Sequence, residues 1–172
     1  TLTTQGDAPI HYTLDGSEPT AASPRYTGPV EIGKSARFRA TALREGGENA
    51  SYSREFAFSK STGRPAVLNT KPNDSYTFEG ASLLVDGYHS RPVFTSGAWL
   101  GYLDEPLDVT IDMGGEQSYR SVELETLAEK GDWIFPPSSV TVWVSDNGTD
   151  FTEVASVTVP EAKAGDADGI GR

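Results

Sequence analysis

Residues 140–159 read VTVWVSDNGTDFTEVASVTV, and this stretch decides the fold class. Its first three valines fall on every second position, a spacing that turns one side of an extended strand toward a core and the other toward solvent. Asp146-Asn147-Gly148 follows, and its glycine supplies the positive φ that a tight turn needs. The stretch therefore predicts a β-hairpin with strands at 140–145 and 151–159.

The same alternation recurs earlier in the chain. Leu107–Met113 places an apolar residue on every second position, and residues 37–42 alternate arginine or threonine with phenylalanine or alanine. No stretch repeats apolar residues at the helical spacing over three turns, and residues 118–130 are expected to form a strand that runs into a loop. Together with 18 glycines and 11 prolines, these patterns predict an all-β protein with negligible helix.

The composition excludes several kinds of chemistry. The 172 residues include no cysteine and only two histidines, His11 and His89, so disulfides, cysteine-based zinc sites and most histidine-dependent sites are not expected. No apolar run approaches the roughly 20 residues of a membrane-spanning helix, so we expect no membrane insertion.

The excess of acidic over basic residues is confined to one part of the chain. Residues 1–62 carry seven basic and seven acidic side chains, whereas residues 63–172 carry the other seven basic and 18 acidic ones, which gives the chain its net charge of −11. Such a surface repels phosphate backbones, so nucleic acid is not an expected partner. The charge balance changes at Ser59–Pro65, which lacks large apolar residues, and we expect domains at 1–60 and 65–172 joined by a linker at 61–64.

The first domain carries the run IHYTLDGSEPTAASPRYTGPVEI at residues 10–32. It resembles the C-terminal domain that follows the catalytic barrel of chitobiases and β-hexosaminidases. The matching positions are Tyr12, Thr13, Asp15, Gly16, Ser17, Pro19, Thr20, Ser23, Tyr26, Gly28 and Pro29. The resemblance implies a small immunoglobulin-like sandwich, here of about six short strands, that acts as an accessory module beside an enzyme.

A catalytic carboxylate pair is the alternative interpretation of this run. Asp15 and Glu18 are the candidates, because glycoside hydrolysis uses two carboxyl groups on opposite sides of the scissile bond. They lie three residues apart on one turn with no opposing wall, so we expect Asp15 to shape the turn and Glu18 to be solvated. The chain itself is therefore predicted to have no enzymatic activity.

The second domain contains five short motifs. They are Leu84-Val85-Asp86-Gly87, Trp99-Leu100-Gly101, Thr110-Ile111-Asp112-Met113-Gly114, Trp133-Ile134-Phe135-Pro136 and the run from Val140 to Val154. They resemble the discoidin domain, also called the factor five/eight C-type domain, which is the fold of many bacterial carbohydrate-binding modules. The resemblance implies a jelly-roll sandwich of about eight strands. The pattern stops after Val159, and residues 161–172, EAKAGDADGIGR, look like a solvated tail. We therefore expect the C-terminal strands of the sandwich to be missing from this sequence.

The discoidin resemblance also implies candidate site residues. Asp86 matches an aspartate that binds a structural calcium ion in the family, although Tyr88 stands where relatives place another oxygen ligand. The alternative is that Asp86 is a turn residue before Gly87. No other cofactor is required. Sugar binding needs aromatic faces and polar groups on loops, and the candidates are Tyr88, His89, Arg91, Trp99, Tyr102 and Trp133. For Trp99 and Trp133 the favoured alternative is that they close the ends of the sandwich.

Together these expectations describe the accessory region of an exported bacterial β-N-acetylhexosaminidase or chitobiase, located in the periplasm, on the outer surface or in the medium. Its partners would be a glycan containing N-acetylhexosamine or galactose and the catalytic domain of the same polypeptide. A protein-interaction or adhesion module without sugar affinity is the alternative, because sandwich folds do not dictate their ligands.

Overall fold

The computed structural model describes residues 1–4, 6–161, 163 and 165–172. The chain divides into two compact units, which we describe separately. Unit 1 comprises Thr1–Thr62 together with Gly87–His89, and unit 2 comprises Gly63–Asp86 and Ser90–Arg172. Whether the units are the two domain types that the sequence resembles stays a prediction, and so does the expectation of missing C-terminal strands.

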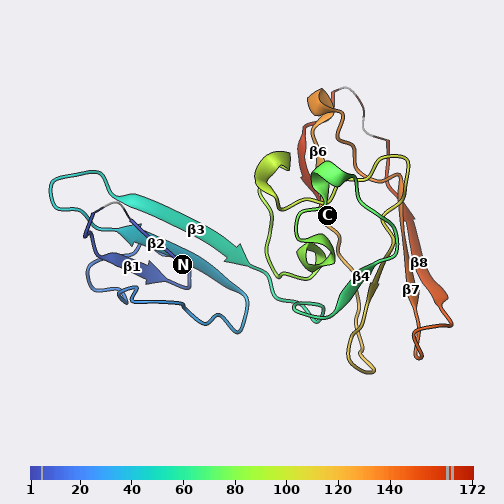
Figure 1. The fold of residues 1–172 in the computed structure, drawn as a ribbon, viewed down its shortest axis with the longest axis horizontal. Helices are drawn as coiled ribbons and strands as arrows, with labels where there is room; N and C mark the ends of the chain where they lie inside the picture. Colours follow the sequence, from blue (N-terminus) through green and yellow to red (C-terminus); the bar gives the residue numbers. More distant parts are fainter. Residues whose placement is uncertain (5, 162, 164) are drawn as a thin grey trace. The chain divides into compact units, whose positions relative to one another are not determined.

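Unit 1 is built on an antiparallel sheet in the order β1-β2-β3 (Figure 1). The strands are β1 (Ile10–Thr13), β2 (Ala36–Ala42) and β3 (Ala50–Phe56). The outer edge of β1 is bonded to the segment around Arg25, since the Tyr26 N–H donates to the Ile10 carbonyl at 2.7 Å.

Among the described residues of unit 1, three strands form where the sequence predicted about six. The segment around Gly28-Pro29 stays irregular because proline has no N–H to donate to a sheet.

The two faces of this sheet differ as the alternation in residues 37–42 predicts. The cross-strand pairs place Tyr12, Ala40 and Tyr52 on one face, and Phe38, opposite Arg54, shares it. Phe38 is 6% exposed and stacks on Tyr12 with ring centroids 5.7 Å apart. This apolar face is the core of unit 1.

The opposite face is polar, yet it also contains a buried residue. Thr41 is only 2% exposed, and its hydroxyl donates to Glu18 Oε1 at 3.1 Å. The other Glu18 oxygen forms an ion pair with Arg39. Glu18 is exposed, as expected, and its carboxylate also binds two side chains of the polar face because the turn after β1 folds back over β2.

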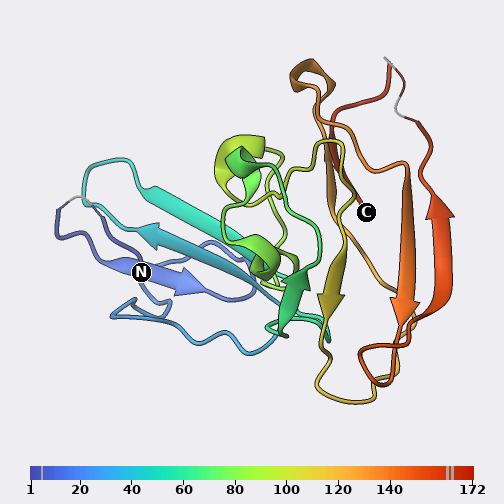
Figure 2. The same ribbon diagram turned by 45° about the vertical axis from the view of Figure 1, so that its right-hand side comes forward.

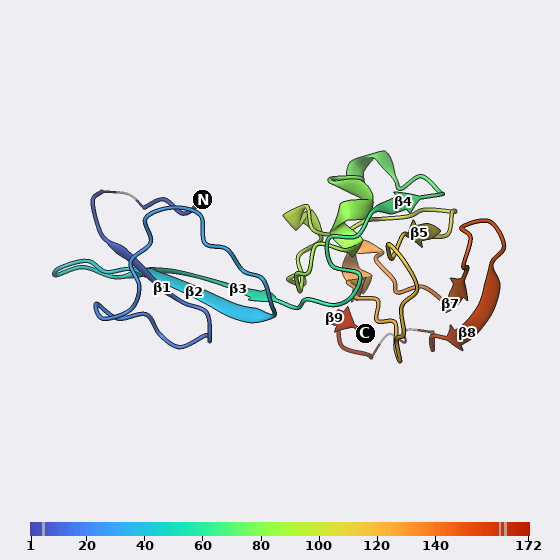
Figure 3. The same cartoon turned by 90° about the horizontal axis from the view of Figure 1, so that it is seen from below.

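The described part of unit 2 contains six short strands in three antiparallel pairs (Figures 2 and 3). The pairs are β4 (Ala66–Leu68) with β5 (Val109–Ile111), β6 (Thr126–Ala128) with β9 (Gly169–Gly171), and β7 (Ser139–Val144) with β8 (Thr152–Thr158). The last pair is the hairpin that the sequence predicts, with a bulge between Val142 and Trp143. The fold class is thus all-β and consistent with β-sandwich architecture, as predicted.

The helical content of the described residues is limited to four 3₁₀ turns. These are η1 (Asp74–Tyr76), η2 (Gly80–Leu84), η3 (Phe94–Ser96) and η4 (Lys130–Asp132). Within the described residues, no helix is long and apolar enough to cross a bilayer.

The C-terminal stretch is more ordered than a solvated tail. In β9, Ile170 pairs with the buried Leu127 of β6. Asp168 accepts a hydrogen bond from Lys130 Nζ at 2.5 Å, and the Asp166 carbonyl accepts a second one at 2.9 Å. One apolar residue and the half-buried Lys130 therefore fix a segment whose composition predicts a loop. Residues 162 and 164 of this stretch lie outside the described residues.

Candidate functional site

A four-residue turn connects β6 to the segment before β7 and carries Trp133 at its end. The turn is closed by a reciprocal pair of backbone hydrogen bonds: Glu129 N–H to the Ile134 carbonyl at 3.0 Å and Ile134 N–H to the Glu129 carbonyl at 3.1 Å. Inside it, the Trp133 N–H donates to the Lys130 carbonyl at 3.2 Å. The position of Trp133 is therefore set by backbone bonds.

Trp133 has an unusual backbone and an unusual exposure. Its φ of 60° and ψ of 31° are left-handed, a conformation that is rare for a bulky side chain and costs about 1–2 kcal/mol. The side chain is 85% exposed, so the expectation that Trp133 closes the end of a sandwich is wrong. A strained backbone that holds an apolar ring in solvent is a feature found at functional sites.

Charged groups surround the Trp133 turn. Partial desolvation raises the pKa of Glu129, and the carboxylates of Asp132 and Asp168 raise it further. Hydrogen bonds from Lys130 lower the pKa of Asp168, because they stabilise its charged form. The turn therefore offers carboxylate acceptors and one ammonium donor within a few residues of the exposed indole.

Arg91 and Trp99 are brought together in unit 2. The Trp99 indole N–H donates to the Arg91 carbonyl at 2.9 Å, and the ring is half-buried, whereas the Arg91 side chain is exposed. Because its polar atom is already bonded, Trp99 has a structural role in fixing the 91–99 loop. This agrees better with the packing alternative than with a free stacking surface.

Tyr102 lies on a different part of unit 2, where its hydroxyl oxygen is buried without a hydrogen bond of good geometry among the described residues. Burial raises the pKa of Tyr102, the nearby Thr70 hydroxyl partly offsets this, and the Asp108 carboxylate adds to it. Thr70 itself donates to the Pro106 carbonyl at 2.7 Å and accepts from the Asp108 N–H at 3.0 Å. Tyr102 therefore presents no polar group to a ligand.

Tyr88 and His89 belong to unit 1. The Arg54 guanidinium carbon lies 3.6 Å from the centroid of the Tyr88 ring, and the Phe56 ring lies 4.9 Å away. These contacts leave Tyr88 little free surface for stacking, and both residues are only partly exposed. Tyr88 thus packs at the end of β3 by a cation–π contact, a role that the sequence did not reveal.

Asp86 is half-buried at the end of the loop that follows η2. Among the described residues, no group of three or more His, Cys, Asp or Glu side chains is placed to hold a metal ion. Calcium prefers six to eight oxygen ligands. A calcium ion at Asp86 would therefore depend on backbone carbonyls and water, and it stays a prediction.

Asp15 and Glu18 do not face each other across a cleft. Asp15 Oδ1 accepts hydrogen bonds from the Ser17 N–H at 2.9 Å and the Ser17 hydroxyl at 2.6 Å, and these bonds lower the Asp15 pKa. Glu18 is bonded to Arg39 and Thr41. Asp15 shapes the turn as predicted, and both carboxylates have structural partners.

Several exposed aromatic residues were not among the predicted candidates, and three of them follow Trp133 in the sequence. Phe135 lies two residues after Trp133 and is half exposed, and Trp143 and Phe151 lie in or beside the β7–β8 hairpin. The alternation of residues 140–144 was a signal for Trp143, because it places this residue on the side opposite the valines. Nothing in the local sequence distinguishes Phe135 from a core residue.

Comparison with known families gives one match. Residues 1–56 match the family model described as Fn3 associated. This match places the N-terminal part of the chain in an immunoglobulin- or fibronectin-III-like context, in line with the three-stranded sheet of unit 1. No curated protein matches the chain.

Proposed function

We propose that this chain is a non-catalytic, glycan-binding accessory region of an exported β-N-acetylhexosaminidase or chitobiase. The observation that carries the proposal is the Trp133 turn: an indole that is 85% exposed on a backbone closed by two hydrogen bonds between Glu129 and Ile134. A rigid aromatic face suits the apolar side of a pyranose ring, and nearby acceptors suit its hydroxyls. The Glu129 and Asp132 carboxylates would supply those acceptors.

The sequence resemblances support the same proposal from another direction. The run at 10–32 resembles an accessory domain of chitobiases, and the motifs of 84–154 resemble discoidin-type binding modules. The family match over residues 1–56 agrees with an accessory role for the N-terminal part. The catalytic domain would be a further part of the same polypeptide, and the ligand a glycan containing N-acetylhexosamine or galactose.

The proposal that the chain is non-catalytic is supported by the contacts of the two candidate carboxylates. A glycosidase keeps two carboxyl groups about 5–10 Å apart across a sugar, whereas Asp15 and Glu18 bind their own turn and sheet. The binding proposal needs no cofactor. A calcium ion at Asp86 would act as a structural addition that fixes the loop.

A protein-interaction or adhesion module is the second candidate. The β7–β8 hairpin favours it, because Trp143, Val154 and Val157 are all more than half exposed. Val157 pairs with Val140 and so lies on the face opposite Trp143. Exposed apolar side chains of this kind are typical of surfaces that bind another protein.

The two candidates are separated by a glycan array with the full chain. We expect the chain to bind glycans ending in N-acetylhexosamine or galactose. This binding should be lost in Trp133→Ala and unchanged in the matched control Trp143→Ala. Binding to a protein and to no glycan would favour the interaction module. Loss of glycan binding in the control alone would place the sugar site at Trp143 and overturn the role proposed for Trp133. Binding that both variants retain would show that neither tryptophan forms the site.

A further inference from the structure

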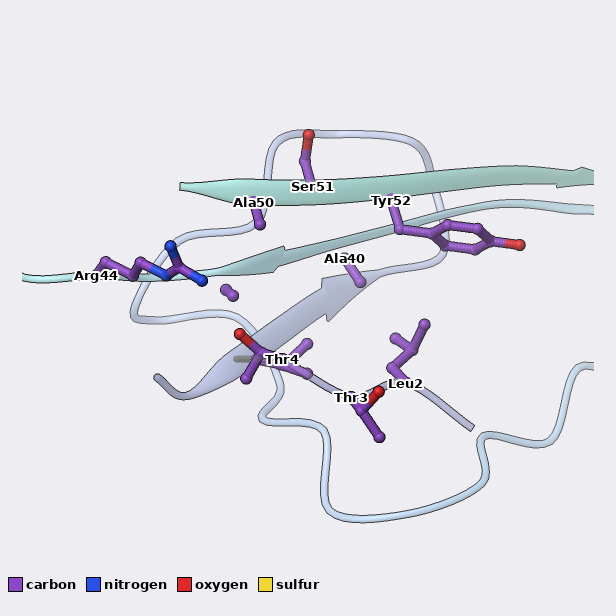
Figure 4. Close-up of a pocket in the computed structure, with 10 residues that line it drawn as sticks. Leu2, Thr3, Thr4, Ala40, Arg44, Ala50, Ser51 and Tyr52 are labelled. Carbon is purple, nitrogen blue, oxygen red and sulfur yellow. The ribbon is translucent and has the colours of Figure 1, made fainter. Parts of the chain in front are cut away.

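Unit 1 contains a groove that none of the proposed functions uses. The groove has a volume of about 320 Å³ and runs between the N-terminal segment Leu2–Thr4 and the apolar face of β2 and β3. Figure 4 shows Arg44 at one end, Tyr52 at the other, and Ala40 and Ala50 between them. All of its described lining residues belong to unit 1.

The floor and one wall of the groove are held in place by the sheet. Ala40 is 3% exposed and pairs with Tyr52 across β2 and β3, so small side chains leave the space open beside the tyrosine ring. Tyr52 is 41% exposed and contacts Phe38 edge-on at 6.4 Å. One part of the ring is therefore anchored in the core while another part faces the groove.

The opposite wall is also fixed. The Leu2 N–H donates to the Tyr26 hydroxyl at 3.1 Å, which ties the N-terminal segment to the rest of unit 1. This segment brings two hydroxyl side chains, Thr3 and Thr4, to the groove. The groove is therefore a feature built from three bonded segments of the unit.

The lining is charged at one position. Arg44 is the sole ionised side chain among the described lining residues; it follows β2, and its N–H donates to Asn49 Oδ1 at 2.9 Å across the turn. The carboxylates of Glu45 and Glu48 lie in the same turn but do not line the groove. The groove thus combines an aromatic wall, an apolar floor, hydroxyl groups and one guanidinium.

We propose that this groove binds a carboxylated sugar ring, such as a uronic acid residue of an acidic glycan. The alanine floor and Tyr52 suit the C–H faces of a pyranose, the threonines suit its hydroxyls, and the planar Arg44 fork suits a carboxylate. A volume near the lower limit of small-molecule pockets, about 300 Å³, fits one ring rather than a chain. The groove belongs to unit 1 and Trp133 to unit 2, and the proposal does not depend on the function proposed for Trp133.

The test is an NMR titration of the full chain with methyl glucuronide, with methyl glucoside as the neutral counterpart. We expect the uronide to shift the amide signals of residues 2–4 and 50–52, and the glucoside to shift them much less. Arg44→Gln should weaken uronide binding about tenfold, because a hydrogen bond to a charged group is lost. Arg25→Gln removes the same charge from an exposed position outside the groove and should leave uronide binding unchanged.

Ala50→Leu provides a second variant that keeps Arg44 and fills the groove. Ala50 is exposed, so the substitution leaves the core intact, and we expect it to abolish the uronide shifts. The proposal is overturned if uronide and glucoside bind equally, if neither binds, or if the filled groove still binds. Shifts caused by an acidic peptide but not by the uronide would also overturn it. Uronide binding should persist in Trp133→Ala, so failure here and failure of the Trp133 proposal are distinguishable.

Discussion

Replacing Trp133 by glycine and by alanine separates the cost of its backbone from the role of its ring. With 85% of the side chain exposed, truncation removes about 40 Å² of buried surface from a side chain of about 250 Å², or about 1 kcal/mol. Alanine at position 133 still has the unfavourable left-handed backbone at φ 60°. Glycine removes this strain of about 1–2 kcal/mol, but it also increases the conformational entropy of the unfolded chain, which offsets part of the gain in stability. We therefore expect Trp133→Gly to be more stable than Trp133→Ala by about 1 kcal/mol.

Urea denaturation measures the stability difference, and calorimetric titration with the best glycan from the array measures binding. Both variants should lose about 2 kcal/mol of binding free energy or more, which is about 30-fold in Kd, as expected for an aromatic hot spot. Trp143 is the matched control because it lies in β7. There the order should reverse, with glycine less stable than alanine by about 0.5–1 kcal/mol.

Two results would refute this reasoning. If Trp133→Ala is as stable as Trp133→Gly, the turn does not hold position 133 in the left-handed conformation. If either variant keeps its affinity within twofold while remaining folded, the indole is not the binding surface.

Three further predictions concern the framework. Phe38→Ala should cost about 3–5 kcal/mol, close to the whole stability of a unit of this size, and amide signals of β1–β3 should report the loss. Gly87→Ala should destabilise unit 1 more than Gly46→Ala, because both have positive φ but only at Gly87 would the new Cβ lie 2.8 Å from Phe58 and Thr62. Hydrogen bonds from Lys130 lower the Asp168 pKa, so their stabilisation is present above the unfolded pKa and is lost as pH falls through the folded one; amide exchange of β9 should quicken there.

Each of these predictions has an opposing result. A loss below about 1 kcal/mol in Phe38→Ala would show that the Tyr12 stack does not form the core. If Gly87→Ala and Gly46→Ala lose the same stability, the contact of the new Cβ with Phe58 and Thr62 does not destabilise unit 1. Unchanged β9 exchange between neutral and acidic pH would show that Lys130 does not hold the C-terminal segment.

Strand alternation was the part of the fold that the sequence could predict well. Residues 37–42 alternate polar with apolar residues, and residues 140–144 place a valine on every second position. Alternating exposure follows along β7 and the first part of β2 because successive side chains of a strand point to opposite faces. The C-terminal strand could not be predicted in this way. Its three residues form a strand only because Ile170 meets Leu127, more than 40 positions earlier.

Side-chain placement was much harder to predict than strands. A tryptophan flanked by glycine and proline suggests packing, and nothing near Trp133 reveals that hydrogen bonds between Glu129 and Ile134 turn it outward. For Tyr88 the difference between the expected and the observed exposure is the reverse. It stands in a polar loop, where exposure is the natural expectation, yet its ring lies beneath Arg54, a residue brought near by the folding of another part of the chain.

Gly87–His89 belongs to unit 1 although it lies far along the chain from Thr62, and this affects how unit 1 can be produced on its own. The Ala57 N–H bonds to the Gly87 carbonyl at 2.7 Å, and Phe56 bridges to Tyr88. A recombinant piece that stops at Thr62 would leave that N–H unpaired and Arg54 without its aromatic partner, so it should express poorly or aggregate. Unit 1 is a discontinuous folding unit. A single cut in the peptide chain cannot isolate it, and a loop replacement that joins residues 62 and 87 directly is the smaller intervention to try first.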